Sequence, residues 1–270
     1  MMTVVTTKPS TPSNEGEPGS LAPGGPQPVS EYRLQVRNAH AEAFTIHRDV
    51  AVTLEDAILA ARAHPDELAV VVLDMLMLQG YKAHLSVSLL SEHAMVEDAA
   101  TIARRLLELS VQAVYIAADD EPRVCRRRAG SYLAFLWRKF PRRFRQNFPA
   151  QAKARWSGYA RKYGRFVRKN AKAWGPHWKQ MFIAIGAEKL YNTDYALLSS
   201  IAHGSPDEQV LTFSATTVKV HAHHHVSALL VFASRYYLTI AEQWNRHFNL
   251  VDPSNLDRMI QTVVRWEPKE

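Results

Sequence analysis

Residues 64–92 read HPDELAVVVLDMLMLQGYKAHLSVSLLSE, and this stretch decides the fold class. Proline suits the first turn of a helix and acidic residues suit its positive end, so His64-Pro65-Asp66-Glu67 predicts a helix start. Apolar residues then recur at helical spacing as far as about Glu92, with Gly80 as a weak point. We expect a long, mostly buried helix with these core side chains: Leu68, Val71, Val72, Met75, Leu78, Leu85 and Leu89.

The same periodicity extends on both sides of this helix, and strand-like alternation is nearly absent. Further helices are expected over 31–47, from Thr53 (where Asp56 completes a capping pattern), and over 99–118, 122–140, 150–173, 174–185, 193–203, 225–248 and 253–265. Only residues 211–220 have extended character. The prediction is therefore an all-α protein, with a single helical-bundle domain over 31–270 behind a disordered, proline-rich tail over 1–30.

Composition limits the cellular setting. The single cysteine, Cys125, rules out an internal disulfide framework. The first residues lack a basic start followed by an apolar stretch, so no secretory signal is predicted. The longest apolar run, Leu68 to Leu78, is interrupted by Asp74 and is far shorter than the roughly 20 residues that span a bilayer. We expect a cytoplasmic protein without an integral membrane segment.

Charge is strongly segregated along the chain. Residues 122–187 hold eighteen lysines and arginines and no aspartate or glutamate, whereas the whole chain has a formal net charge of +7. The remaining residues are therefore net acidic. A dense group of cations draws phosphates and releases their counterions, which predicts an anionic partner. The cleanest amphipathic pattern lies over 150–173, with aromatic residues on one side and cations on the other: Arg155, Arg161, Lys162, Arg165, Arg168, Lys169 and Lys172.

This basic helix has three interpretations. Its aromatic residues can be core anchors, with the cationic side binding the phosphates of a nucleic acid, RNA being favoured. The aromatic residues can instead stack on unpaired bases. A helix of this composition also fits an anionic membrane surface. We rank the membrane second to nucleic acid because the apolar face is rich in tyrosine and poor in leucine.

Two patterns of polar residues are candidates for a site. Arg104 and Glu108 lie one turn apart in an apolar helix, either as an ordinary surface pair or lining a cleft. A second set recurs every four residues: Tyr191, Tyr195, Ser199 and His203. His203 is expected in a last helical turn, where the dipole favours a protonated ring, and such a ring beside serine and arginine suits phosphodiester chemistry. The alternative is a capping histidine with two tyrosines as core filler.

A histidine cluster at His221-Ala-His-His-His225 is a third candidate. His221 and His225 are one turn apart and could bind a metal through facing imidazoles. However, no cysteine lies near, and Asp207 and Glu208 stand beyond the extended piece. A solvated turn is the simpler account, so we predict no metal and no cofactor.

Two segments carry a resemblance. The run VEDAATIARRLLE over 96–108, followed by Tyr115, Ile116 and Asp119, resembles one half of a bacterial helical family of unknown function. The other half is similar to this set: Trp178, Gly186, Tyr191, Tyr195, Ser199 and His203-Gly204-Ser205. The resemblance covers about 65–248. Members look distantly like the HEPN fold (higher eukaryotes and prokaryotes nucleotide-binding), a helical bundle that recurs in RNA-cleaving toxins and phage-defence proteins.

The resemblance implies a protein that binds or cleaves RNA, with a metal-independent ribonuclease of a bacterial defence or stress pathway as the enzymatic form. HEPN ribonucleases carry an arginine shortly before the histidine on the same helix. Here Ala196, Leu197 and Leu198 hold those positions, so Arg104 is expected to supply the cation from another helix. Bundle proteins of this resemblance often pair, which makes a homodimer a further expectation.

The roles that follow are assigned to five residues. His203 is the general acid or base, Arg104 steadies the phosphate charge, and Glu108 orients Arg104. Ser199 and Tyr195 give hydrogen-bonding support. The alternative is a non-catalytic protein that binds nucleic acid or another anionic surface, in which the same polar residues form a buried network that fixes helix register.

Overall fold

The computed structural model describes residues 29–61, 67–167, 174–203, 213–214, 217–218 and 225–266. Several features that the sequence singled out lie outside these described residues: the tail over 1–28, the helix start at 64–66, the basic residues Arg168, Lys169 and Lys172, the acids Asp207 and Glu208, and the histidines at 221, 223 and 224.

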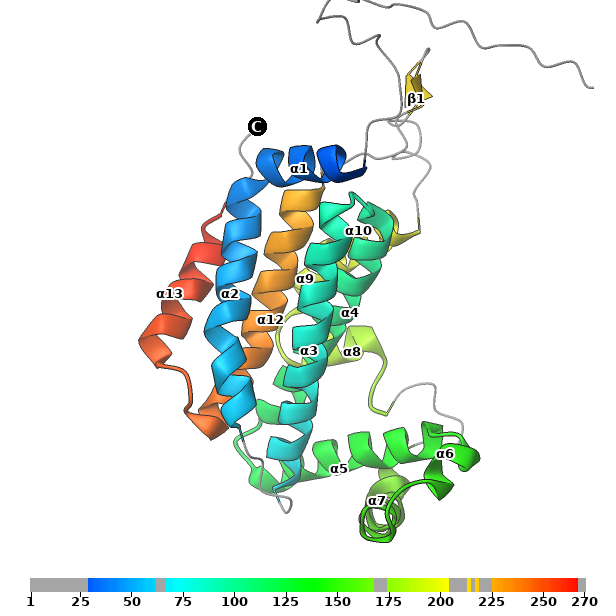
Figure 1. Cartoon of the computed structure of the whole chain (residues 1–270). Helices are drawn as coiled ribbons and strands as arrows, with labels where there is room; N and C mark the ends of the chain where they lie inside the picture. The colour runs from blue at the N-terminus through cyan, green and yellow to red at the C-terminus, as the bar shows by residue number, and fades with distance from the viewer. Residues whose placement is uncertain are drawn as a thin grey trace, which may run out of the picture.

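The described chain is helical, which confirms the predicted all-α class. Its helices (Figure 1) are α1 (Val29–Ala39), α2 (Ala41–Ala60), α3 (Leu68–Glu92), α4 (Val96–Ala117), α5 (Pro122–Lys139), α6 (Arg142–Gln146), α7 (Ala150–Tyr163), α8 (Trp178–Ala184), α9 (Glu188–Leu190), α10 (Ala196–Ala202), α12 (Val226–Phe248) and α13 (Pro253–Val264). Two short strands, β1 (Phe213–Ser214) and β2 (Thr217–Val218), pair antiparallel within the stretch expected to be extended.

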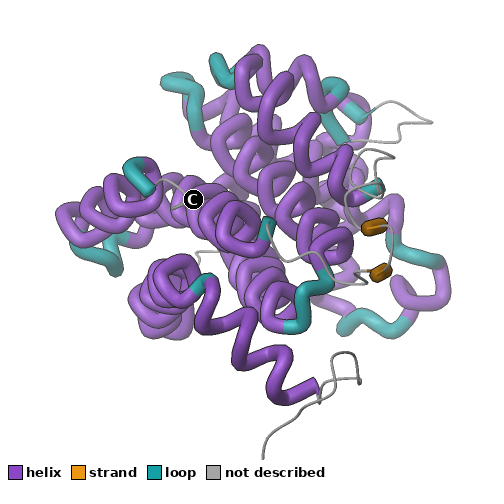
Figure 2. Tube along the Cα trace, turned by 90° about the horizontal axis from the view of Figure 1, so that it is seen from above, coloured by secondary structure: helices purple, strands orange, loops and turns teal. Residues whose placement is uncertain are grey.

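Three long helices, α3, α4 and α12, pack along one another and form the centre of a bundle. On one side α2 lies against α12 and α3, with α13 outside it, and on the other side α10 lies against α4. Figure 2, seen from above, shows how helices make up almost all of the described chain. Leu54, Leu73, Leu106 and Trp244 are fully buried in one continuous hydrophobic cluster that reaches from α1 to α13.

The central helix α3 ends at Glu92 as predicted, but the predicted core face is only partly correct: Leu68 and Val72 are buried, whereas the predicted residues further along are not. Its most deeply buried apolar side chains are Val72, Leu73, Leu76, Met77 and Val87. Three of the residues expected in the core are exposed at 42–59%: Leu78, Leu85 and Leu89. Apolar residues occur all round this helix, so its own periodicity could not select the face. Packing against α4 and α12 selects it.

By length and composition alone, α3 is the one helix of the described residues that could cross a membrane. Part of α3 is buried inside the bundle, and the core helix of a bundle can be equally long and apolar. One of its charged residues, Asp74, has a partner inside the bundle, because Trp244 Nε1 donates to Asp74 Oδ1 at 3.2 Å.

Gly80 does not interrupt α3, because the close approach of α12 requires a small residue there. A Cβ at this position would lie 3.0 Å from Ile240 Cδ1 and 3.1 Å from Tyr237 Cδ2. The packing gained between the two helices outweighs the low helix propensity of glycine.

The first two helices differ from their predicted bounds. The chain turns between Ala39 and Ala41, and α2 then continues through Thr53 to Ala60, so the predicted start at Thr53 is wrong. Thr53 Oγ1 donates to the carbonyl of Asp49 at 2.8 Å, one turn back in the same helix. A threonine can cap a helix or bond back within one, so the capping pattern does not fix a start.

Helices α5, α6 and α7 form an arm that extends from one end of the bundle, at the lower right of Figure 1. We call residues 122–163 the basic arm. Its centre is aromatic: Trp137 on α5 stacks on Trp156 of α7 with ring centroids 6.1 Å apart. Phe140 and Phe148 meet Trp137 edge-on at 6.5 and 5.6 Å.

The end of α7 is tied to α5. A Cβ at Gly130 would lie 2.5 Å from the ring of Tyr163, so the two helices touch there. Arg138 donates from Nη2 to the carbonyl of Gly164 at 2.9 Å and from Nη1 to that of Val167 at 3.1 Å.

The predicted helix over 150–173 therefore ends earlier, at Tyr163, and a 3-10 turn follows over Gly164–Phe166. Trp156 and Tyr163 pack inward, which confirms their interpretation as anchors. Phe166 is 45% exposed, and the Arg165 guanidinium lies 4.9 Å from its ring centroid.

Candidate functional site

Helices α4 and α10 pack together and bring the predicted polar residues to one place. Glu97 and Asp98 suit the positive end of α4. The inner face of α4 is buried, and Arg104 lies half-buried at its side. Leu198 and Ile201 of α10 are buried against the bundle, which leaves Ser199 and His203 facing Arg104.

Arg104 is the centre of this site. Its Nη1 lies 3.5 Å from Ser199 Oγ and 3.4 Å from His203 Nε2. Its Cζ lies 5.9 Å from the ring centroid of Tyr195. A guanidinium only donates, so Nε2 of His203 accepts in this contact and the ring proton lies on Nδ1. His203 is exposed, so the site is open to solvent.

A π-helical turn over Tyr191–Tyr195 precedes α10. Such turns occur frequently at functional sites. The rings of Tyr191 and Tyr195 stack 5.1 Å apart, and both meet Phe182 edge-on. Burial raises the pKa of Tyr195, and the charge of Glu108 raises it further against the opposing effect of Arg104. The phenol therefore keeps its proton at neutral pH and remains a hydrogen-bond donor beside Arg104.

Glu108 does not pair with Arg104, so its predicted orienting role is wrong in that direct form. Its Oε2 accepts from Arg105 Nη1 at 3.1 Å, one turn away on the same helix. Arg104 is instead directed toward Ser199 and His203 on α10. The sequence could not decide this pairing because Arg104 and Arg105 are both within reach of Glu108. The contact of Arg104 with α10 leaves Arg105 to pair with the carboxylate.

The sequence did not single out Asp194, which holds the π-helical turn against α12. Its Oδ2 accepts from the Tyr236 hydroxyl at 2.8 Å and lies 3.6 Å from Arg235 Nη1. Burial and this carboxylate raise the pKa of Tyr236 well above its usual range. The position of an acid next to Tyr195 was a visible signal. Its partner lies on a later helix, which periodicity does not reveal.

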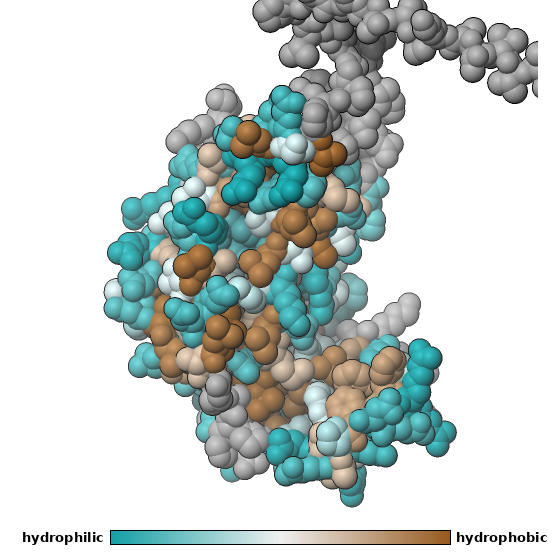
Figure 3. Space-filling model, in the orientation of Figure 1, coloured by the Kyte–Doolittle hydropathy of each residue, from teal (hydrophilic) through white to brown (hydrophobic). Residues whose placement is uncertain are grey.

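The cations expected to bind nucleic acid are apart from His203. Arg155, Arg161 and Lys162 are exposed on the arm, and Arg165 is exposed in the 3-10 turn that follows it. Figure 3 shows hydrophilic side chains along the outer edge of the arm. The arm joins the bundle beyond Ala117, at the C-terminal end of α4. Arg104 precedes Ala117 by about 20 Å along that helix, at 1.5 Å per residue. The structure thus forms two separate polar regions.

In the described part of the chain, no group of three or more His, Cys, Asp or Glu side chains is placed to hold a metal ion. His225 directly precedes α12, whereas His221 lies outside the described residues. Metal binding by the His221–His225 cluster stays an open alternative.

The fold and the Arg104–His203 site define an all-α protein with an exposed, intramolecular arginine–histidine contact. The chain belongs to DUF5677, a family of unknown function whose model matches residues 71–212. The matched region includes Arg104, Ser199, His203 and the whole arm, while α2 and α12 lie outside it. Neither the curated proteins nor the solved structures gave a match.

Proposed function

We propose that this protein is a HEPN-like, RNA-directed protein of the cytoplasm that cleaves RNA without a metal, in a defence or stress response. The observation that carries the proposal is the position of the Arg104 guanidinium, 3.4 Å from His203 Nε2 and 3.5 Å from Ser199 Oγ, at a surface open to solvent. An arginine fork matches the geometry of a phosphate, and a neutral imidazole can accept a proton.

In the proposed reaction, Arg104 binds the scissile phosphate, and this binding replaces its contact with His203 Nε2. The freed Nε2 lone pair takes the proton of the ribose 2′-hydroxyl. The 2′-oxygen then bonds to phosphorus, the bond from phosphorus to the 5′-oxygen breaks, and the leaving oxygen takes a proton from solvent. Ser199 and the protonated Tyr195 donate hydrogen bonds to the charged phosphate oxygens. The products are a 2′,3′-cyclic phosphate and a 5′-hydroxyl.

The basic arm supports an RNA substrate independently of the site. Thirteen cations and no acidic residue over 122–163 attract a polyanion and raise its concentration near the protein. This attraction weakens as salt is added, because counterions released on binding then enter a more concentrated salt solution and their release is less favourable.

A non-catalytic role is the second candidate, favoured by the distance between the arm and the site. An anionic partner can lie on the arm without contact to His203. In that case the Arg104–Ser199–His203 contacts serve to fix α10 on α4, and their loss lowers stability.

The test is a time course of single-stranded RNA with the wild-type protein and with His203→Ala, in the presence of EDTA. We expect cleavage to fall by about 10²–10⁴-fold in the variant, the usual range for loss of a general acid or base. His93→Ala, at the end of α3, is the matched control and is expected to cleave normally.

Two results would contradict the ribonuclease. One is intact RNA with every protein. The other is equal loss of activity in both histidine variants. If His203→Ala lowers the melting temperature and leaves RNA binding unchanged while no protein cleaves RNA, the structural role is correct.

A further inference from the structure

Two hollows lie next to each other where the basic arm meets the bundle, and both are lined by Leu68 and Arg126. The first has a volume of about 360 Å³ and lies among α3, α4, α5 and the end of α12. The second, of about 300 Å³, lies between α3 and the arm. Since they share two residues, one elongated ligand could occupy both.

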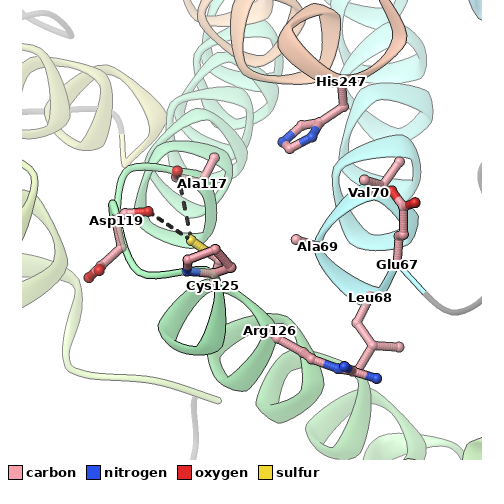
Figure 4. Close-up of a pocket in the computed structure, with 10 residues that line it drawn as sticks. Glu67, Leu68, Ala69, Val70, Ala117, Asp119, Cys125, Arg126 and His247 are labelled. Carbon is pink, nitrogen blue, oxygen red and sulfur yellow. Dashed lines mark hydrogen bonds between the residues drawn. The ribbon is translucent and has the colours of Figure 1, made fainter.

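The first hollow has mostly apolar walls. Val70, Ala117 and Pro122 line it, and the Cys125 thiol donates to the carbonyl of Asp119 at 3.3 Å. Figure 4 shows His247 pointing into this hollow from α12. Its mostly apolar lining suits an organic ring, with a few polar groups to orient it.

The second hollow is cationic. Arg126, Arg155 and Lys162 line it together with Tyr159, and no carboxylate does. Among the described residues, neither Arg126 nor Arg155 forms an ion pair. Like charges gathered in this way repel one another, and a bound anion would remove the repulsion. Two guanidinium forks are well matched to phosphate oxygens.

We propose that the two hollows together bind one nucleotide unit, with the ring in the apolar hollow and the phosphate against Arg126, Arg155 and Lys162. This inference rests on the proposed function in that it takes an RNA strand as the natural source of the unit. A free nucleotide has the same chemistry. The site is distinct from the Arg104–His203 site, which lies toward the other end of α4.

The test is calorimetric titration of the full chain with adenosine 5′-monophosphate, adenosine, inorganic phosphate and a 5′-phosphorylated single-stranded RNA. The double variant Arg126→Ala/Arg155→Ala is compared with Arg142→Ala/Arg143→Ala on α6. Both remove two arginines from the arm, but the second pair lines neither hollow. We expect at least tenfold weaker nucleotide binding in the first double variant and less than twofold change in the second.

Gly158→Leu separates loss of the site from loss of the fold. Gly158 lines the second hollow within α7, and a Cβ there would meet nothing within 4 Å. Leucine favours a helix more than glycine does, so the melting temperature is expected to rise. Its side chain fills part of the hollow, so nucleotide binding is expected to weaken at least fivefold.

Equal weakening of nucleotide binding in both double variants would overturn the inference, because it would indicate a general attraction of anions by the arm. Nucleotide binding no tighter than binding of inorganic phosphate would also overturn it. Capture by anionic lipid vesicles without binding of nucleotide or RNA would also overturn it. Binding of both free nucleotide and RNA supports the site, and their relative affinities identify the source. If the wild type binds nucleotide but cleaves no RNA, the site stands and the ribonuclease fails. If the wild type cleaves RNA but binds no nucleotide, the ribonuclease stands and the nucleotide site fails.

Discussion

The bundle and the basic arm are both helical, but different side chains hold them together. In the bundle, Leu73, Leu106 and Trp244 are fully buried, and the indole of Trp244 donates to a carboxylate. In the arm, Trp156 is only half-buried, and its partners are other aromatic rings. The arm also holds its cations without one acidic residue of its own.

This difference separates residues needed by the fold from residues available to a partner. Unbalanced positive charge destabilises a compact state through repulsion, and the aromatic packing of the arm must overcome that cost. Arg138 is an exception because it bonds to the backbone at the end of α7. Among the described residues, neither Arg126 nor Arg155 makes a comparable bond to the backbone, so both are available to the proposed ligand.

The histidines show the same contrast. His47 and His84 are buried in the bundle, with rings stacked 3.5 Å apart, whereas His203 is exposed. His47 Nε2 lies 2.9 Å from the carbonyl of His84, and its Nδ1 lies 3.1 Å from Ser234 Oγ. Burial lowers the pKa of His47 to about 4, and burial together with the neighbouring ring lowers that of His84. The buried pair contributes to stability, whereas the His203 ring is accessible to solvent and contacts Arg104.

The largest expected effect tests the contrast between the two cores. Trp244→Ala should lower the free energy of unfolding by about 3–5 kcal/mol, as expected for a buried tryptophan. Trp156→Ala should cost roughly 1–2 kcal/mol, because less of its area is removed from water. Urea unfolding followed by circular dichroism gives both values. Equal losses of unfolding free energy would contradict this contrast, because they would show that the arm and the bundle are stabilised equally by their tryptophans.

Acid should weaken the bundle through its buried histidines. In the unfolded chain the pKa of histidine is near 6.5, so below pH 6.5 the unfolded state binds more protons than the folded state. For His47 alone the free energy of unfolding should fall by about 2 kcal/mol between pH 6.5 and 4.5, and His84 acts in the same direction. Neither contributes a pH dependence well above pH 6.5.

The measurement is urea unfolding at several pH values for the wild type and for His47→Gln. The variant should show a smaller loss of stability on acidification, because glutamine does not titrate. Identical pH profiles for the two proteins would exclude His47 as a source of acid sensitivity.

A smaller effect should be confined to the arm. In Gly130→Ala the new Cβ would lie 2.5 Å from the Tyr163 ring unless α5 and α7 move apart. We expect a cost of about 2 kcal/mol, typical of overpacking, and faster hydrogen exchange in α7 than in α4. Mass spectrometry of exchanged peptides checks this. Uniform acceleration across the bundle would show that the arm does not open by itself.

Much of the fold followed from the sequence alone because helix periodicity and end signals are local properties. The helical class, most helix positions and the concentration of charge over 122–187 needed no tertiary information. The spacing of Tyr195, Ser199 and His203 also placed these residues together, and Ser199 and His203 do face Arg104.

Only the tertiary structure decided which helix faces meet. Arg104 contacts residues 95 and 99 positions later in the chain, a relation that no local pattern encodes. The pairing of Glu108 with Arg105, the anchoring of Asp194 by Tyr236 and the exposure of Leu78, Leu85 and Leu89 have the same origin. The sequence determines which side chains a helix can offer. Packing between helices determines which of them are buried, paired or left for a partner.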